Sequence, residues 1–276
     1  VDPEYGRSPI IHQFNFNIQR EIVKNTVLDF GYVGRTATAL REGQLKRLNQ
    51  VPASALEKYG RNLNNVVNNA ADAARNGVPY PYPGFVGTVA SALRPYPQVR
   101  GNSTVDVYAA PLGFSTYHAF QVSVDRQFGG GLSVYANYVW SKGLTNIESS
   151  DPTGNTNRPL DYYNLSLEKA ISDFDVPHMF KGYVNYELPF ARRNRLLGGW
   201  SASLIVNYFS GTPLGFGGSF PLANGWNGAI NRANIAAGNM KVENFDKSKF
   251  ELSMLTSPGN TYLNKSLYSD PPPLTL

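Results

Sequence analysis

The chain has 276 residues, which is long enough for one large β domain or two ordinary domains. Only 16% of its residues are charged, against roughly 25% in soluble domains, while 13% are aromatic, with 17 Tyr and 15 Phe. This composition argues against a helical enzyme, and the absence of cysteine excludes a disulfide, a thiolate metal site and a cysteine nucleophile. The net charge is +5, but outside Arg192, Arg193 and Arg195 the basic residues are scattered, so we expect no nucleic-acid binding.

Membrane-spanning helices are not expected from the sequence. No stretch approaches the roughly 20 consecutive apolar residues that such a helix needs, and the mean hydropathy is −0.31. A membrane β-barrel is compatible with both observations, because its strands are polar at every second residue. The first residues, VDPEYGRSP, lack the apolar core of a signal peptide, so we expect that a leader was removed or that the chain begins inside a longer protein.

Alternating residues near the N-terminus predict a first β-hairpin. In residues 9–20, Phe14 and Phe16 share one side of the chain, and polar residues share the other. A polar link at 21–25 follows, and residues 26–35 alternate in the same way. Two runs of period 2 joined by a short polar link are typical of two antiparallel strands.

Residues 36–115 break the alternation and are predicted to form a long loop. Within them, residues 52–76 have helical spacing, with Ser54 as a candidate cap and with Gly77 and Pro79 ending the helix. The residues expected on one face of that helix are Leu56, Leu63, Val67 and Ala70. The predicted loop is far longer than the usual few residues, and long insertions at one end of a barrel are typical of extracellular loops.

The clearest hairpin follows at residues 117–140, where two alternating runs meet at Gly129, Gly130 and Gly131. Each run has about the nine to eleven residues that a tilted strand needs to cross a bilayer, whereas most soluble strands have about five or six. Trp140, near the end of the second run, suits a membrane interface. This hairpin therefore predicts strands that cross a membrane.

A second long loop is predicted at residues 143–173, followed by strands at 178–190 and 200–209. Short turns thus alternate with long loops, which is typical of outer-membrane barrels. We predict an all-β fold: an antiparallel up-and-down transmembrane β-barrel, or part of one, with long extracellular loops, one of which contains a short helix. Residues 1–215 are expected to hold the barrel strands, and residues 216–276 an irregular, loop-rich C-terminal segment.

Six segments in chain order carry a resemblance to a known family. They are GRSPIIHQFNFNIQREIVKNTVLDFGYVG, LNQVP, ALRPYPQ, YHAFQVSVDRQFGGGLSVYANYVWSK, DFDVPHMFKGYVNYELPF and GWSASLIVNYFSGTPL. Together they resemble TonB-dependent-receptor-like outer-membrane proteins, most closely the Oar-like group with a carboxypeptidase-regulatory-like domain. The resemblance covers roughly residues 5–215 and implies a late portion of a barrel of about twenty-two strands. It also implies energy supplied through a periplasmic TonB-type protein.

Charged residues at inward positions of the predicted strands are candidates for the wall of a barrel lumen. They are Asp29, Asp125, Lys181 and Glu187. A lysine facing lipid at mid-depth costs roughly 2–4 kcal/mol, so Lys181 is expected to point inward. A second candidate is a loop surface for a ligand or partner, formed by aromatic residues between prolines. These are Tyr80, Tyr82, Phe85 and Tyr96, and the alternative is that this loop packs on itself.

No catalytic, cofactor or metal site is expected. The three histidines, His12, His118 and His178, each lie near a strand start at the long-loop end, and a metal site would need at least three converging ligands. A set of loop carboxylates lacks the spacing of a calcium loop and is expected to be solvated. The members of that set are Asp161, Glu168, Asp173 and Asp175. No GxSxG motif is present, and GFGGSF at residue 215 lacks the third glycine of a dinucleotide site.

We therefore expect a non-enzymatic barrel segment of TonB-dependent-receptor type in the bacterial outer membrane, which binds or takes up a ligand. The expected partners are outer-membrane lipid, a periplasmic TonB-type protein reached through a missing N-terminal part, and other copies or the rest of a longer chain. One alternative is a structural or adhesive cell-surface protein that assembles by strand-edge pairing. Another is a secreted β protein that binds carbohydrate through exposed Tyr and Trp. In that case a core between two sheets would bury Phe14, Phe30, Phe120 and Leu204.

Overall fold

The computed structural model divides the chain into two compact units. The sheet unit comprises Val1–Lys46, Tyr108–Asn157 and Glu168–Gly215, and the loop unit comprises Arg47–Val107, Arg158–Leu167 and Phe216–Leu276. The residues that the structure describes are 6–42, 45–99, 105–128, 130–147, 159, 161–189, 199–213, 234–239, 242, 245–246, 248 and 263–269.

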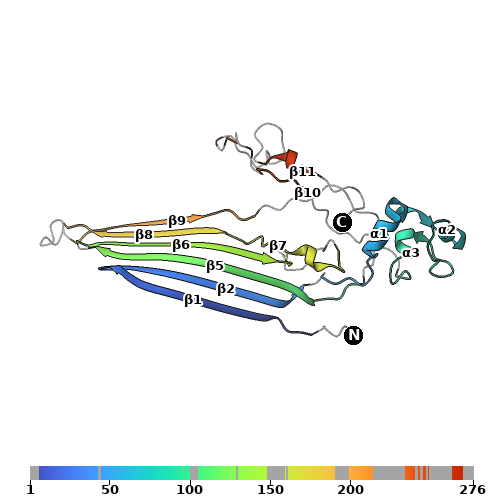
Figure 1. Ribbon diagram of the computed structural model, residues 1–276, viewed down its shortest axis with the longest axis horizontal. Helices are drawn as coiled ribbons and strands as arrows, with labels where there is room; N and C mark the ends of the chain where they lie inside the picture. The colour runs from blue at the N-terminus through green and yellow to red at the C-terminus, as the bar shows by residue number, and fades with distance from the viewer. Residues whose placement is uncertain are drawn as a thin grey trace. The chain divides into compact units, whose positions relative to one another are not determined.

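The sheet unit is one antiparallel sheet of long strands, as predicted (Figure 1). The sheet order is β1-β2-β5-β6-β8-β9, and the short strand β7 adds to the end of β6. The bounds are β1 Ile10–Val23, β2 Thr26–Glu42, β5 Ala110–Phe128, β6 Leu132–Thr145, β7 Ala170–Ile171, β8 His178–Glu187 and β9 Ser201–Phe209. Each long strand pairs with the next long strand along the chain, which is the up-and-down arrangement.

Residues that tolerate a left-handed backbone close the short turns. Between β1 and β2, Asn25 has φ 58° and donates its backbone N–H to the Glu21 carboxylate at 2.9 Å. Val23 pairs with Thr26, so this turn is shorter than the link expected at residues 21–25. Between β5 and β6, Gly130 and Gly131 have φ of 97° and 89°, a conformation that a side chain disfavours.

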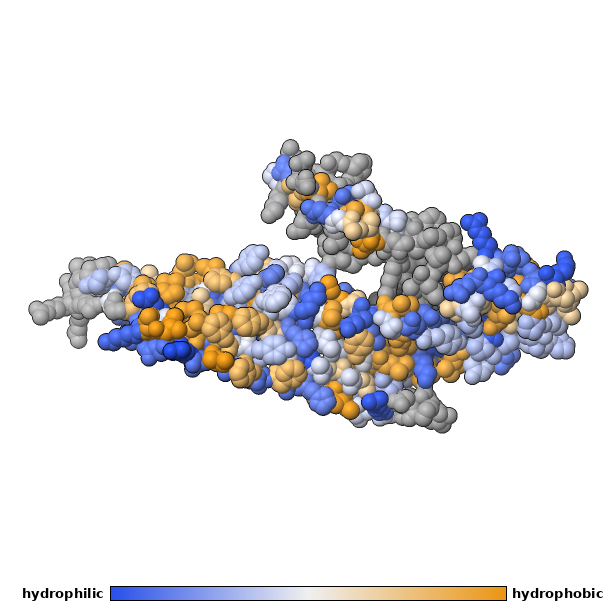
Figure 2. Space-filling view, viewed as in Figure 1, coloured by the Kyte–Doolittle hydropathy of each residue, from blue (hydrophilic) through white to orange (hydrophobic). Residues whose placement is uncertain are grey.

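The register places the alternating side chains on two distinct faces. Across the sheet, Phe30 is opposite Val122, Val122 is opposite Tyr138, and Tyr138 is opposite Phe180, so apolar residues form continuous rows. We call this the outer face, and the opposite one the inner face. The apolar residues of the outer face include Phe14, Phe16, Ile18, Leu28, Phe30, Tyr32, Phe120, Val122, Val124, Val134, Ala136, Tyr138, Trp140, Phe180, Val184, Leu204, Val206 and Tyr208. Figure 2 shows hydrophobic residues gathered over the strands.

The height of the outer face matches a membrane. On β6 the apolar row runs from Leu132 to Trp140, and eight steps (140 − 132) of about 3.4 Å give about 27 Å along the strand. A strand tilt of about 40° reduces this to roughly 21 Å, close to the apolar band of about 25 Å on outer-membrane barrels.

The secreted two-sheet alternative is wrong, because the four residues that it would bury are exposed. Phe14 is 47% exposed, Phe30 40%, Phe120 42% and Leu204 60%, so none of the four lies in a core between two sheets. An exposed apolar face of this size requires a covering medium, because monomeric soluble proteins rarely expose such a contiguous patch.

The strands extend further into the predicted loops than expected. The sequence predicts the first loop at 36–115, but β2 continues to Glu42 and β5 begins at Ala110. Irregular register beyond Ala37, with Ala39 at φ 55°, disrupts the alternation in sequence while strand pairing continues. In the loop predicted at 143–173, β6 continues to Thr145, and the 3₁₀ helix η2 (Leu165–Glu168) and β7 follow.

The C-terminal segment at 216–276 contributes few described residues. Among them, β10 (Asn234–Ile235) pairs with β11 (Tyr268–Ser269), and the 3₁₀ helix η5 (Lys265–Leu267) precedes β11. No helix within the described ranges combines the length and the apolar character needed to cross a membrane.

The loop unit is a small folded body with its own core, and it contains several short helices where we expected one. They are α1 (Ala53–Tyr59), η1 (Gly60–Asn64), α2 (Ala70–Arg75) and α3 (Val89–Ala92), and β3 (Val66–Val67) pairs with β4 (Gly87–Thr88). The core contains Val51, Leu56, Leu63, Val67, Ala73, Val78, Phe85 and Val89.

The single helix predicted at 52–76 is wrong. Gly60 adopts φ 49° and ends α1, and an asparagine-rich stretch then changes to the strand β3 before α2 begins. Ser54 lies inside α1, whose N-cap is Pro52 without a side-chain hydrogen bond, so the predicted cap is also wrong. Leu56, Leu63 and Val67 are buried as expected. Ala70 is exposed, and Ala73 is buried in its place.

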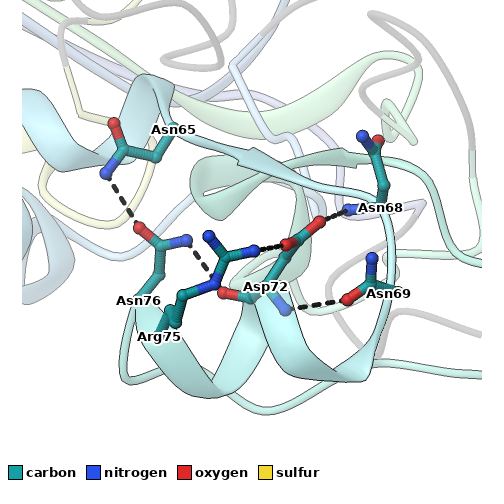
Figure 3. Close-up of polar contacts among 6 residues, drawn as sticks. All are labelled: Asn65, Asn68, Asn69, Asp72, Arg75 and Asn76. Carbon is teal, nitrogen blue, oxygen red and sulfur yellow. Dashed lines mark hydrogen bonds and ion pairs between the residues drawn. The ribbon is translucent and has the colours of Figure 1, made fainter.

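Asparagine and aspartate side chains determine where α2 starts (Figure 3). The N-cap Asn69 accepts a hydrogen bond from the Asp72 N–H at 2.9 Å, and the Asp72 carboxylate accepts one from the Asn68 N–H at 3.1 Å. Arg75 forms an ion pair with Asp72, and the Asn76 amide donates to the Asp72 carbonyl at 2.9 Å. These contacts satisfy N–H groups that a helix start leaves without partners.

Replacing Asn69 with alanine should destabilise the loop unit by about 1 kcal/mol, because the Asp72 N–H loses its cap. Hydrogen exchange of residues 66–78 should become faster, while exchange in the long strands stays unchanged. Asn69→Ser retains a capping oxygen and is the control. Equal acceleration in both variants would contradict the assigned cap.

Candidate functional site

The inner face of the sheet contains a row that is polar across the whole width of the sheet. One row crosses every long strand: Gln19, Asp29, Ser123, Asn137, Lys181 and Asn207. Elsewhere on this face, the Ser203 hydroxyl donates to the Asn185 side-chain oxygen at 2.8 Å, linking β9 to β8. Amides and hydroxyls therefore dominate this row, in which the charges are widely spaced, whereas a neighbouring row of the same face contains Val139, Met179 and Phe209.

The four charged residues predicted to face a lumen all lie on this inner face. Asp29 and Lys181 belong to the same row, but β5 and β6 separate their strands, so roughly 14 Å lies between them at about 4.8 Å per strand. Asp125 is opposite Val27 and Tyr135, and Glu187 is opposite Ser201. Within the described strands, no ion pair joins these four side chains to one another.

The histidines lie at the long-loop end of the strands, as expected from the sequence. They lie on the outer face, which the sequence analysis does not specify. The Tyr32 hydroxyl is 2.8 Å from His118 Nδ1, and the Tyr138 hydroxyl is 2.7 Å from His178 Nδ1. Both pairs are diagonal across two neighbouring strands, and their rings stack with centroids 6.2 and 6.1 Å apart. His12, opposite Thr36, lies on the same face.

The loop unit contains a buried polar cluster centred on Gln50. Gln50 is 1% exposed and donates from Nε2 to Asp161 Oδ1 at 2.9 Å. Its side-chain oxygen accepts from the Tyr162 N–H at 2.8 Å, and its carbonyl accepts from the Tyr163 hydroxyl at 3.0 Å. These contacts join the first long loop to the second, because Gln50 belongs to one and residues 161–163 belong to the other.

The local environment also makes the Tyr163 hydroxyl less acidic. Burial, followed by the charges of Asp161 and Tyr96, raises the pKa of Tyr163 above 10.0. This hydroxyl donates to the Gln50 carbonyl. Asp161 also accepts a hydrogen bond from the Tyr163 N–H at 2.9 Å.

A second set of contacts closes the base of the loop unit. Arg47 Nε and Asp106 Oδ1 are 2.9 Å apart, and the Leu48 N–H donates to the Val105 carbonyl at 3.1 Å. The Arg47 guanidinium also lies 5.0 Å from the centroid of the Tyr162 ring. The two chain ends that enter this unit from β2 and β5 are thus held together within it.

The aromatic loop residues predicted to form a binding surface differ in exposure. Phe85 is 2% exposed, and the Tyr80 and Tyr82 rings pack edge-on against it at 6.3 and 5.5 Å. The Tyr80 hydroxyl donates to the Phe85 carbonyl at 3.2 Å, which fixes the turn between them. Tyr96 alone of the four is largely exposed, and its backbone bonds to both ends of the Asn49 amide.

The loop carboxylates expected to cluster lie in different places. Asp161 belongs to the loop unit, whereas Asp175 belongs to the sheet unit and accepts from the Gly143 N–H at 2.8 Å. Glu168 is buried and Asp173 is exposed. Within the part of the chain that the structure describes, no three His, Asp or Glu side chains converge as metal ligands would.

Sequence reasoning did not find Gln50 or Asn49 as organising residues. Polar amides are usually exposed, so nothing in their residue type indicated burial. The only signal was the LNQVP segment, which stood out through the family resemblance and not through chemistry.

Comparison with known proteins is consistent with this geometry. The family described as "Outer membrane beta barrel domain" matches residues 1–276. Neither a search of curated proteins nor a search of solved structures finds a match. With the alternating faces and the membrane-height apolar band, the match shows that this chain is a bacterial outer-membrane protein and belongs to the outer membrane beta barrel domain family.

Proposed function

We propose that this chain forms part of the wall of a TonB-dependent-receptor-type protein, which binds a ligand and admits it across the outer membrane without chemical conversion. The observation that carries this proposal is the unbroken polar row from Gln19 to Asn207 on the inner face. Amide and hydroxyl groups bind polar solutes without trapping them as a strong charge would. The segments that resemble Oar-like proteins support the same reading.

The unpaired edges of the described sheet indicate that other strands are needed to complete the wall. The outermost strands, β1 and β9, each pair on one side only among the described strands, and the smallest membrane barrels have about eight strands. We propose that further strands, from the rest of a longer chain, close the wall. A periplasmic TonB-type protein would then supply energy through that other part.

Uptake by cells that produce the whole natural protein tests the proposal. Labelled polar solutes of both charges should accumulate, and a protonophore that collapses the inner-membrane gradient should abolish their accumulation. Lys181→Glu reverses a charge on the inner face and should shift preference from anionic to cationic solutes by several-fold. Lys24→Glu, in the exposed short turn, is the matched control.

Two results would count against the proposal. Accumulation that survives the protonophore would remove the TonB-type role. The same shift in both lysine variants would show that the inner face is not the ligand path.

A structural or adhesive role is the second candidate, and the exposed edge of β1 favours it. Every residue of β1 is exposed, so its free backbone groups are open to pairing with another copy. Detergent-extracted particles should then contain several copies in contact through β1 and β9. Cross-linking between cysteines introduced at Gln13 and Asn207 would detect that contact, and a single copy per particle would exclude it.

A further inference from the structure

Carboxylates are confined to one face of the sheet in its regularly paired part. The paired strand carboxylates Glu21, Asp29, Asp125 and Glu187 all lie on the inner face. The outer face carries the cations Arg20, Arg126 and Lys142, and within the described register of the long strands it carries no carboxylate. The face that meets lipid thus carries cations alone, whereas the inner face carries carboxylates together with the cations Arg35 and Lys181.

Lys142 lies between two of the histidines. It is directly opposite His118 on β5, and its neighbour on the same face, Trp140, is opposite His178 on β8. Directly opposed side chains are about 5 Å apart and diagonal ones about 7–8 Å apart. His118, Lys142 and His178 therefore form one exposed group, which we call the rim triad.

Each imidazole of the rim triad is held by a tyrosine in the same way. Each tyrosine hydroxyl is within hydrogen-bond distance of Nδ1, and when it donates there the hydrogen of the neutral ring is on Nε2. The repeat of one diagonal geometry in β2–β5 and β6–β8 leaves two imidazole N–H donors beside one ammonium. This is a donor set for an anion with several oxygens.

The position of the triad identifies the anion. Trp140 is 57% exposed and lies next to Lys142 on the outer face, at the long-loop end of the apolar band. Aromatic girdles mark the membrane interface, and long loops mark the extracellular side. The next position outward is therefore at the head-group level of the outer leaflet.

The carboxylate of Asp175, which binds the residue after Lys142, lies on the other face of the sheet. Asp175 binds the Gly143 N–H, and its Oδ1 lies 3.5 Å from where a Cβ on Gly143 would be, on the side of Tyr117. That side is the inner face, because Tyr117 and Gly143 are partners there. Lys142 therefore remains available to a ligand on the lipid side.

We propose that His118, Lys142 and His178 bind the phosphate of a phosphorylated lipid in the outer leaflet, with the rings of Trp140 and Phe120 against its acyl chains. The site depends on the outer-membrane assignment and is independent of ligand uptake.

The test uses the natural protein, purified from outer membranes in mild detergent. Native mass spectrometry would count the phosphorylated glycolipid bound to wild type, to Lys142→Gln and to His118→Gln/His178→Gln. Each variant should retain about tenfold less lipid, as expected for loss of a charge-assisted hydrogen bond. Lys181→Gln removes the same charge from the inner face and should retain the wild-type amount.

Further variants and added lipids distinguish a specific phosphate site from other causes of lipid loss. Lys142→Arg retains the positive charge and should therefore retain the lipid. This variant separates the effect of charge from poor folding of Lys142→Gln. Added glycolipid should restore binding to stripped wild type, whereas the same lipid without phosphates, or inorganic phosphate alone, should not. Full lipid retention in Lys142→Gln, or an equal loss in Lys181→Gln, would overturn the site.

Discussion

Replacing Val124 with lysine should lower the free energy of unfolding in lipid vesicles by about 2–4 kcal/mol, the cost of a lysine facing lipid at mid-depth. Val124 lies between Leu28 and Ala136 on the outer face, in the middle row of the apolar band. No row of polar groups lies within reach of the new ammonium at that height. Urea titration of the reconstituted natural protein, monitored by tryptophan fluorescence, measures the change.

The control is the adjacent residue on the other face. Ser123→Lys places the same side chain on the inner face, opposite Asp29, where it gains an opposite charge. We expect this variant to unfold within about 1 kcal/mol of wild type. If the two lysines cost the same, the outer face does not meet lipid, and the assignment of the two faces would be wrong.

Replacing Asp161 with alanine should destabilise the loop unit by roughly 3 kcal/mol, because one buried and one partly buried donor lose their acceptor. These donors are Gln50 Nε2 and the Tyr163 N–H, and Asp161 itself is only 5% exposed. Amide hydrogen exchange at Tyr162 and Tyr163 should become faster by about two orders of magnitude, since about 1.4 kcal/mol corresponds to a factor of ten.

Two further variants make this expectation specific. Asp173→Ala removes an exposed carboxylate from the same loop and should leave the exchange of both tyrosines unchanged. Gln50→Glu places a second carboxylate against Asp161 and should destabilise the unit as Asp161→Ala does. Exchange that stays slow in Asp161→Ala would show that the two loops are joined by other contacts.

The sheet could be predicted because its residues obey one simple rule. Phe120, Val122 and Val124 alternate with polar residues, and a period of 2 has no other regular solution than a strand with two different faces. The rule fails at Ala39, where an irregular register shifts the alternation while the strand continues to Glu42.

The loop unit could not be predicted in the same way. Its apolar residues have helical spacing from Leu56 to Val67, but Gly60 and the asparagines after Leu63 favour turns and caps over a continuous helix. The Gln50 cluster depends on contacts with Asp161 and Tyr162, more than a hundred residues away, and no local pattern carries such a pairing.

The rim triad, too, could be predicted from the sequence only in part. The sequence places His118 and His178 near strand starts, and alternation puts Lys142 on their face. The pairing of Lys142 with His118 follows from the short turn between β5 and β6. The approach of His178 follows only from the register between β6 and β8, which is set across a long connection.

The closed base of the loop unit also changes how the barrel wall can assemble. Closing a chain into a loop costs entropy that grows with its length, by about 0.6 kcal/mol for each doubling. Once the Arg47–Asp106 ion pair and the Leu48–Val105 hydrogen bond have formed, the two ends of the long insertion between β2 and β5 lie close together. The insertion then behaves as a short connection. An insertion that folds first would therefore lower the entropic cost of pairing β2 with β5.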